Sequence, residues 1–197
     1  QTVYWYFHKW RTDGYLSHCI EKLVMKILRK RRQSATPSVM ALDAQSVKWG
    51  NRQSNNGFDA NKKVKGIKRN IAVDRNGFIL GRYVSSAGIH DSRLASPVCV
   101  QVYDAWPSVR KGLVDRGYRG ELIENIKRDF NIDIEVCSTP NGTNGFTPKP
   151  LRWVVERTFA WLDGFRRLTR NYEITNESAE EMIDFATLKL LLNHVEH

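Results

Sequence analysis

The chain has 197 residues, which is enough for one domain with a sizeable hydrophobic core. A hydrophobic content of 41% and six Trp residues argue for a folded globular protein rather than a disordered one. The balance of 31 Lys and Arg against 21 Asp and Glu gives a net charge of +10, which favours a polyanionic partner.

The chain starts with a pattern typical of helices over residues 1–33. Apolar residues recur there at helical spacing, and RKRR at 29–32 closes the pattern. Residues 33–38 (QSATPS) have the composition of a linker. Because VYWYFHKW at residues 3–10 already looks like the inside of a helix, we expect that a segment upstream of it is missing.

The hydrophobic period then changes to that of strands, with helices between the later ones. DRNG at 74–77 is typical of a hairpin turn, and helical stretches at 91–105 and 120–130 imply parallel crossovers. We expect a mixed five-stranded sheet with helices on both faces, closed by helices at 148–170 and 178–195; Ser178 and Glu181 form a capping-box pattern for the last one. The expected strands are 39–42, 67–73, 78–84, 111–114 and 132–136.

The cysteines and the apolar runs exclude several classes of protein. Cys19, Cys99 and Cys137 lie far apart and lack metal-ligand spacing, so we expect reduced thiols and no zinc site. No apolar run approaches the roughly 18 residues of a membrane span, and no signal-peptide pattern is present. We therefore expect a soluble cytoplasmic protein without a membrane partner.

Two aspartates follow buried strands of the expected sheet. Asp43 follows VMAL and Asp115 follows GLV, so both are expected at the carboxyl ends of strands, where open α/β sheets place their ligands. Asp74 also follows an apolar run, but it begins the DRNG turn and is explained by that role. If the first and fourth strands are neighbours, Asp43 and Asp115 converge.

Glu156 interrupts the otherwise apolar helix LRWVVERTFAWL at the border of its buried face. One interpretation is an ordinary helix pair with Arg152, four residues earlier. The other is that Glu156 joins Asp43 and Asp115 as a third carboxylate. Three carboxylates without a charge partner would repel one another, and hard oxygen ligands of this kind suit Mg²⁺ or Mn²⁺.

Several motifs occur in one order along the chain: ALDAQSVK, DANKKVKGIKRNIAVD, GIHDS, VDRGYRGE and RWVVERTFAWL. In this order they resemble the motifs of bacterial insertion-sequence DDE transposases of the insertion-sequence-five family. The resemblance covers about residues 39–170, with weaker similarity from residue 4 onward.

The resemblance implies a ribonuclease H-like catalytic domain over residues 38–197, with residues 1–37 as a remnant of an N-terminal DNA-binding region. It implies Asp43, Asp115 and Glu156 as catalytic metal ligands for two Mg²⁺ ions, with Mn²⁺ as a substitute. The implied partners are double-stranded DNA, as element terminal inverted repeats and as target, on which the chain acts as a homodimer or higher oligomer in the bacterial nucleoid.

The last helix departs from the superfamily pattern at two positions. Arg152 matches the usual Arg before the Glu, but Lys149 and Asp163 stand where Tyr and Lys are frequent. The DNA-end contacts usually made by that Tyr and Lys are therefore not implied here. Arg166 and Arg167 are candidates to replace them.

Other basic residues form the candidate DNA surface. The alternative for the cluster KKVKGIKR is a solvated strand edge protected by lysines. The candidates in this cluster are Lys62, Lys63, Lys65, Lys68 and Arg69.

Accessory candidates flank the two later strands. Asp91 in GIHDS is expected to cap the following helix, or to lie near the metals together with His90. Tyr118 and Arg119 in GYRGE are expected either to form a tight turn or to touch DNA.

Two other functions fit part of the pattern. A truncated or decayed copy would bind DNA without catalysis. A glycosidase would use paired carboxylates, but the basic charge and the lack of a sugar-stacking pattern oppose it.

Overall fold

The computed structural model describes residues 1–137 and 152–196. The chain begins with two helices, α1 (Thr2–Thr12) and α2 (Tyr15–Lys30). They are separated at Gly14, whose φ of +63° lies in the left-handed region that glycine adopts without strain. The expected helical segment is confirmed, with this break in it. α2 buries its apolar face, including Val24 and Ile27, against α6 and the sheet.

The sheet contains the five expected strands and a short sixth one. The strand order is β2-β3-β1-β5-β6, and β4 pairs with β3. β1, β3 and β4 form an antiparallel meander, whereas β5 is parallel to both β1 and β6. The strands are β1 (Val39–Lys48), β2 (Gly57–Asp59), β3 (Val64–Val73), β4 (Ile79–Ser86), β5 (Lys111–Val114) and β6 (Asp133–Val136).

The turn between β3 and β4 is built around Asp74, as predicted. Its Oδ1 accepts from the backbone N–H groups of Asn76 at 2.8 Å and Phe78 at 2.9 Å. The backbone of Asp74 also exchanges hydrogen bonds with Phe78 and Gly77. Burial raises the pKa of Asp74, and these hydrogen bonds offset part of that effect. The Asp74 side chain therefore has a structural role in this turn.

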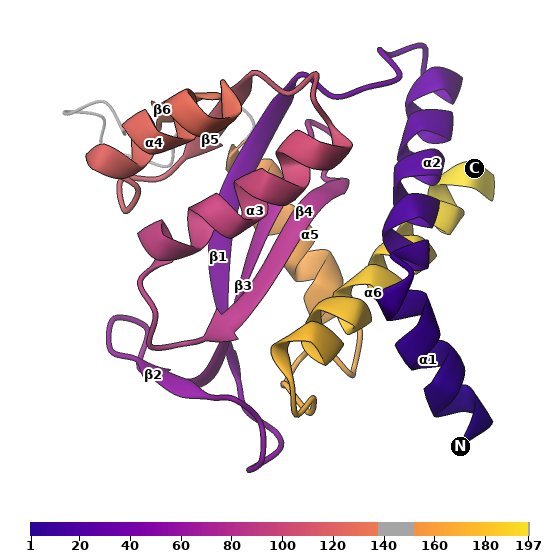
Figure 1. The fold of residues 1–197 in the computed structure, drawn as a ribbon, viewed down its shortest axis with the longest axis vertical. Coiled ribbons are helices and arrows are strands. Elements are labelled where there is room, and N and C mark those ends of the chain that lie inside the picture. The colour runs from indigo at the N-terminus through magenta and orange to yellow at the C-terminus, as the bar shows by residue number, and fades with distance from the viewer. Residues whose placement is uncertain (138–151, 197) are drawn as a thin grey trace.

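Helices cover both faces of the sheet (Figure 1). α3 (Asp91–Ala105) and α4 (Glu121–Phe130) pack with α2 on the face that carries Met40 and Leu42 of β1. α5 (Arg152–Asp163) packs on the opposite face, which carries Ala41 and Val47, together with part of α6 (Asn176–Glu196). This is the ribonuclease H-like arrangement that the sequence predicted.

The closing helices differ from the expected bounds. α6 begins at Asn176, because the Thr175 hydroxyl accepts from the Ser178 N–H at 3.2 Å and ends the preceding loop. Glu181 is buried instead of capping the helix. The predicted capping box of Ser178 and Glu181 is therefore wrong. The part of the expected helix before Arg152 lies outside the described residues.

Among the helices of the described ranges, none combines the length and the apolar character that a membrane crossing requires.

Candidate active site

Asp43 lies inside a long strand and not at its carboxyl end. β1 continues for five residues beyond it, because the polar segment after Asp43 pairs with β3 as far as Lys48. The Oδ1 atom of Asp43 accepts from the N–H of Ala44 at 2.7 Å, which fixes the carboxylate against its own strand. The predicted position at a strand end is thus wrong, although the pairing of β1 with β5 stops at Ala41, two residues earlier.

Asp115 is the first residue after β5, as predicted. β1 and β5 are parallel, and Ala41 is paired with Leu113, so continuation of that register sets Asp43 opposite Asp115. Alternation along β1 puts the Asp43 side chain on the face of Ala41, which α5 covers. Asp115 follows the last residue of β5 and begins the turn in which its Oδ1 accepts from Gly117 N. Adjacent strands lie about 4.8 Å apart. The condition for the expected convergence, that the first and fourth expected strands are neighbours, is met.

Glu156 lies on the second turn of α5 and is exposed. Its neighbours Val154, Val155 and Leu162 are buried against the sheet. These contacts hold α5 on the same sheet face as Asp43 while Glu156 stays at the border of the helix. The helix that bears Glu156 thus packs on the sheet face of Asp43, next to the strand that ends just before Asp115.

The outer side of α5 is fixed to the β3–β4 turn. Arg157 lies between the rings of Trp153 and Trp161, at 4.4 and 4.6 Å from their centroids, and donates to the Asn76 carbonyl at 2.7 Å. Thr158 donates to the Gly77 carbonyl at 3.0 Å. The helix that bears Glu156 is therefore held by directed contacts as well as by its apolar face.

A polar brace joins the other end of α5 to the sheet. Asp163 accepts from Gln45 Nε2 at 2.7 Å and lies 3.8 Å from Arg69 Nη1. Arg69 is only 2% exposed, and burial lowers its pKa to about 10, an effect that Asp163 opposes. Because Gln45 is two residues from Asp43 and Asp163 is seven from Glu156, the brace links the two elements that carry these carboxylates.

Carboxylate oxygens, which Asp43, Asp115 and Glu156 carry, are ligands that divalent cations such as Mg²⁺ prefer. Within residues 1–137 and 152–196, no three Asp, Glu, His or Cys side chains converge closely enough to enclose a metal ion. Mg²⁺, however, commonly takes one or two protein carboxylates and keeps several waters that substrate phosphates replace. Two neighbouring aspartates with a glutamate on the facing helix meet that requirement.

Tyr118 is a buried neighbour of this group and not a surface residue. Its side chain is 1% exposed, and its hydroxyl makes no hydrogen bond to any residue that the structure describes. Burial raises the pKa of the phenol, and the charges of Asp43, Asp91 and Asp115 raise it further. The predicted contact of Tyr118 with DNA is wrong, since a buried ring cannot reach DNA.

His90 and not Asp91 caps α3. The Ser92 N–H donates to His90 Nδ1 at 3.3 Å. Asp91 is the first residue of the helix and pairs with Lys68 at 2.7 Å, while Lys68 also lies 3.6 Å from Asp59. The predicted cap by Asp91 is therefore wrong, because its carboxylate is taken up by a nearly buried lysine.

The basic candidates divide into exposed and buried residues. Lys68 and Arg69 are buried and ion-paired, so the structure removes them from the predicted DNA surface. Lys62 donates to the Ala44 carbonyl at 2.9 Å. Lys63 and Lys65 are exposed.

The cations after Asp115 and after α5 are exposed as well. Arg119 donates to the Arg116 carbonyl, and Arg167 pairs with Glu173 at 2.7 Å, while Arg166 stays at the surface. Lys149 and the side chain of Arg152 lie outside the described residues.

Sequence reasoning missed the brace of Gln45, Arg69 and Asp163. The available signal was strand parity: Gln45 shares the face of Asp43, and a polar side chain there has to be satisfied beneath α5. Arg69 occurs in a lysine-rich segment, so its inward direction was hidden by its neighbours.

Similarity to known proteins extends over most of the chain. Residues 34–188 match the family model described as a transposase DDE domain. A Burkholderia cepacia protein named as a transposase for insertion sequence element IS402 is 29% identical over 173 residues, which cover 80% of this chain and 79% of that protein.

Proposed function

We propose, from the premise that this chain belongs to the transposase DDE domain family, that it cleaves DNA at insertion-sequence ends and joins the freed 3′-hydroxyl to target DNA. Asp43, Asp115 and Glu156 are the metal-binding catalytic residues of this proposal. The observation that supports it is the parallel register of β1 and β5, which would set Asp43 opposite Asp115 if continued two residues past Ala41 and Leu113, with the helix of Glu156 packed on the sheet face of Ala41. The family generally uses divalent metal ions, and we propose Mg²⁺, replaceable by Mn²⁺, with two ions per site.

The reaction exchanges one phosphodiester for another. A water oxygen attacks the phosphorus at the element end, and the 3′ oxygen leaves as a hydroxyl. This 3′-hydroxyl then attacks a target phosphorus, whose own 3′ oxygen departs. Asp43, Asp115 and Glu156 would hold the metal ions, which when bound would supply Lewis-acid activation of the attacking oxygen and stabilisation of the leaving one.

Asp43 and Asp115 contribute through the orientation of their carboxylates. Asp43 and Asp115 are held through Oδ1 by backbone N–H groups, at 2.7 Å from Ala44 N and 2.8 Å from Gly117 N. This orientation limits the rotation of both carboxylates and prepares them to bind cations. Exposed cations, among them Lys63, Lys65 and Arg166, attract the phosphate backbone of double-stranded DNA.

Cleavage and strand transfer on the terminal repeats of the element test the proposal. Glu156→Gln keeps the shape of the side chain but removes a charge that the cations need, so both reactions should be abolished while DNA binding is retained. The matched control is Glu124→Gln on the exposed side of α4, which should react like the wild type.

A second readout follows metal binding directly. Electron paramagnetic resonance of Mn²⁺ should report weaker binding to Asp115→Asn and Glu156→Gln than to the wild type. Unchanged Mn²⁺ binding together with retained cleavage would contradict the assignment. A wild-type chain that binds the ends but cleaves under no metal condition would favour the alternative of a copy that only binds DNA.

The proposal has three further parts. We propose that the chain belongs to the insertion-sequence-five branch, that residues 1–37 derive from an N-terminal DNA-binding region, and that the active form on DNA is a dimer or higher oligomer. Light scattering of the protein with and without terminal-repeat DNA tests the oligomeric state.

A further inference from the structure

Beyond the carboxylates, Lys65 of β3 has an aromatic residue beside it on each of the two neighbouring strand segments. Lys48 is paired with Gly66, and the next residue, Trp49, donates its N–H to the Lys65 carbonyl at 3.1 Å. On the other side of β3, Lys65 is paired with Phe58 of β2. Because opposed residues of antiparallel strands share a face, Trp49, Lys65 and Phe58 form one row, which we call the aromatic row.

The aromatic row is accessible and ordered. Phe58 is 58% exposed, and Lys65 Nζ lies 5.0 Å from the centroid of the Trp49 ring. Trp49 is held by its neighbours, because Gly50 N donates to the Asn171 carbonyl at 2.7 Å and Asn171 N donates to the Lys48 carbonyl at 2.8 Å. The exposed ring of Phe58 thus stands on hydrogen-bonded strands and not on a free loop.

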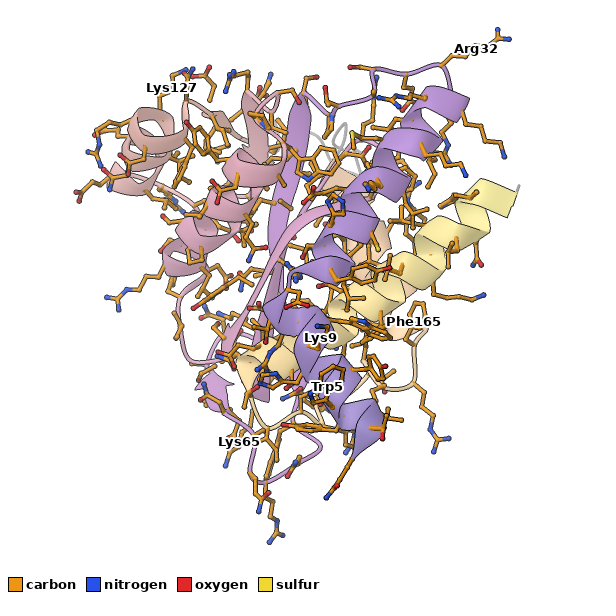
Figure 2. The ribbon with its side chains drawn as sticks, turned by 45° about the vertical axis from the view of Figure 1, so that its right-hand side comes forward. Trp5, Lys9, Arg32, Lys65, Lys127 and Phe165 are labelled. Carbon is orange, nitrogen blue, oxygen red and sulfur yellow. The ribbon has the colours of Figure 1, made fainter. Side chains whose placement is uncertain are left out.

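The charge around the aromatic row is positive. The carboxylates nearest to it are already paired, Asp59 with Lys68 and Glu173 with Arg167. Figure 2 shows Lys65 at the end of the molecule opposite Lys127 and Arg32. The exposed cations on and beside the row are Lys48, Arg52, Lys62, Lys63, Lys65 and Arg170.

The exposed ring of Phe58 and the half-buried ring of Trp49, among cations, match the chemistry of unpaired nucleotides. Every base has a π-face that stacks on an aromatic side chain, and the phosphates are attracted by the lysines. In duplex DNA the base faces are stacked on one another, so Phe58 would gain little from them. An acidic peptide would satisfy the lysines but would leave both rings without a partner.

The aromatic row lies on the same sheet face as Asp43. Asp43 and Trp49 are both odd-numbered residues of one extended segment, and six residues at about 3.3 Å each separate them by roughly 20 Å. Helix α5 and the brace of Gln45, Arg69 and Asp163 lie between them on this face, so the aromatic row is a contact separate from the proposed catalytic carboxylates.

We propose that Trp49, Lys65 and Phe58 bind unpaired DNA nucleotides. The inference rests on the proposed function, which supplies DNA as the partner. It adds that the DNA in contact with the aromatic row is locally single-stranded.

Fluorescence anisotropy with labelled DNA tests the inference. The probes are a blunt duplex and the same duplex with an unpaired tail of eight nucleotides. We expect the wild type to bind the tailed probe more tightly. Phe58→Ala should weaken that binding by about 5-fold or more, the equivalent of roughly 1 kcal/mol, and should change blunt-duplex binding less than about 2-fold.

Two variants serve as controls. Phe58→Trp should restore tail binding, because an indole also stacks on bases. Tyr103→Ala removes a similarly exposed ring from α3, at 45% exposure, and should leave both affinities unchanged. Circular dichroism confirms that each variant is folded.

The outcomes separate this inference from the proposed function. Equal effects of Phe58→Ala on both probes, no gain from the tail, or equal competition by polyglutamate would overturn the inference even if the protein cleaves DNA. A tail effect that depends on Phe58 in a protein without metal-dependent cleavage would support the inference and overturn the proposed function alone.

Discussion

The buried guanidinium of Arg69 makes Asp163 a stability determinant despite the exposure of that carboxylate. Arg69 is 2% exposed, and Asp163 lies 3.8 Å from it. Removing one partner of a fully buried pair costs about 3–5 kcal/mol. Because Asp163 is half exposed and solvent screens the pair, we expect Asp163→Ala to lower the free energy of unfolding by about 2 kcal/mol. For a chain of this size, that shifts Tm by about 4–8 °C.

Urea unfolding followed by circular dichroism measures this effect. Asp133→Ala is the control, because Asp133 forms a shorter ion pair with Lys127, at 2.6 Å, but on the surface. It should change the free energy of unfolding by at most about 0.5 kcal/mol. Burial and not contact distance therefore decides the ranking of the two variants.

A double-mutant cycle identifies the cause. Arg69→Met replaces the buried charge by an apolar side chain of similar length, so Asp163→Ala should cost little in the Arg69→Met background. If Asp163→Ala destabilises no more than Asp133→Ala, or if Arg69→Met fails to relieve it, the assignment of the brace is refuted.

Three further predictions concern charge and burial. Lys63→Ala with Lys65→Ala should flatten the dependence of log Kobs on log salt by about 0.9 for each phosphate that the variant no longer neutralises, and an unchanged slope would leave these lysines as a solvated strand edge. Burial raises the pKa of Asp184 to about 7, so the folded state binds this proton more tightly than the unfolded state. The free energy of unfolding should therefore fall as pH rises from about 4 to 7. Measurements of Tm against pH should show a smaller fall for Asp184→Asn than for the wild type. Tyr118→Phe removes a buried hydroxyl without a hydrogen bond to the described residues, so calorimetry should find a Tm equal to or above that of the wild type.

The sequence predicted the sheet well because hydrophobic period and turn chemistry are local. DRNG specified its turn through Asp74, and the helix between the third and fourth expected strands implied a parallel crossover, which the parallel pairing of β1 with β5 bears out. The convergence of Asp43 and Asp115 was expected on the condition that these two strands are neighbours. The part of the site that depends on strand order was therefore accessible from the sequence.

The missed features depend on partners that are distant in the sequence. The expected first strand ended at Leu42 because the apolar run ends there, yet the polar segment DAQSVK pairs with β3 and extends β1 to Lys48. Lys68 and Arg69 belong to a basic run, and their burial follows from Asp91 and Asp163 on elements that pack from opposite faces. The three-residue β2 is too short to give a periodic signal.

The length of β1 connects the proposed chemistry to the proposed nucleotide contact. A single face of this strand carries Asp43, Gln45 and, one residue past its end, Trp49, so a register slip of one residue would turn all three toward α3. Gly66 opposes that slip: a Cβ at this position would lie 1.9 Å from the Val47 carbonyl oxygen, so a residue with a side chain could not take this place in the pairing. The same pairing that extends β1 beyond its expected end at Leu42 therefore sets the direction of the proposed catalytic carboxylate Asp43, of the brace and of the aromatic row.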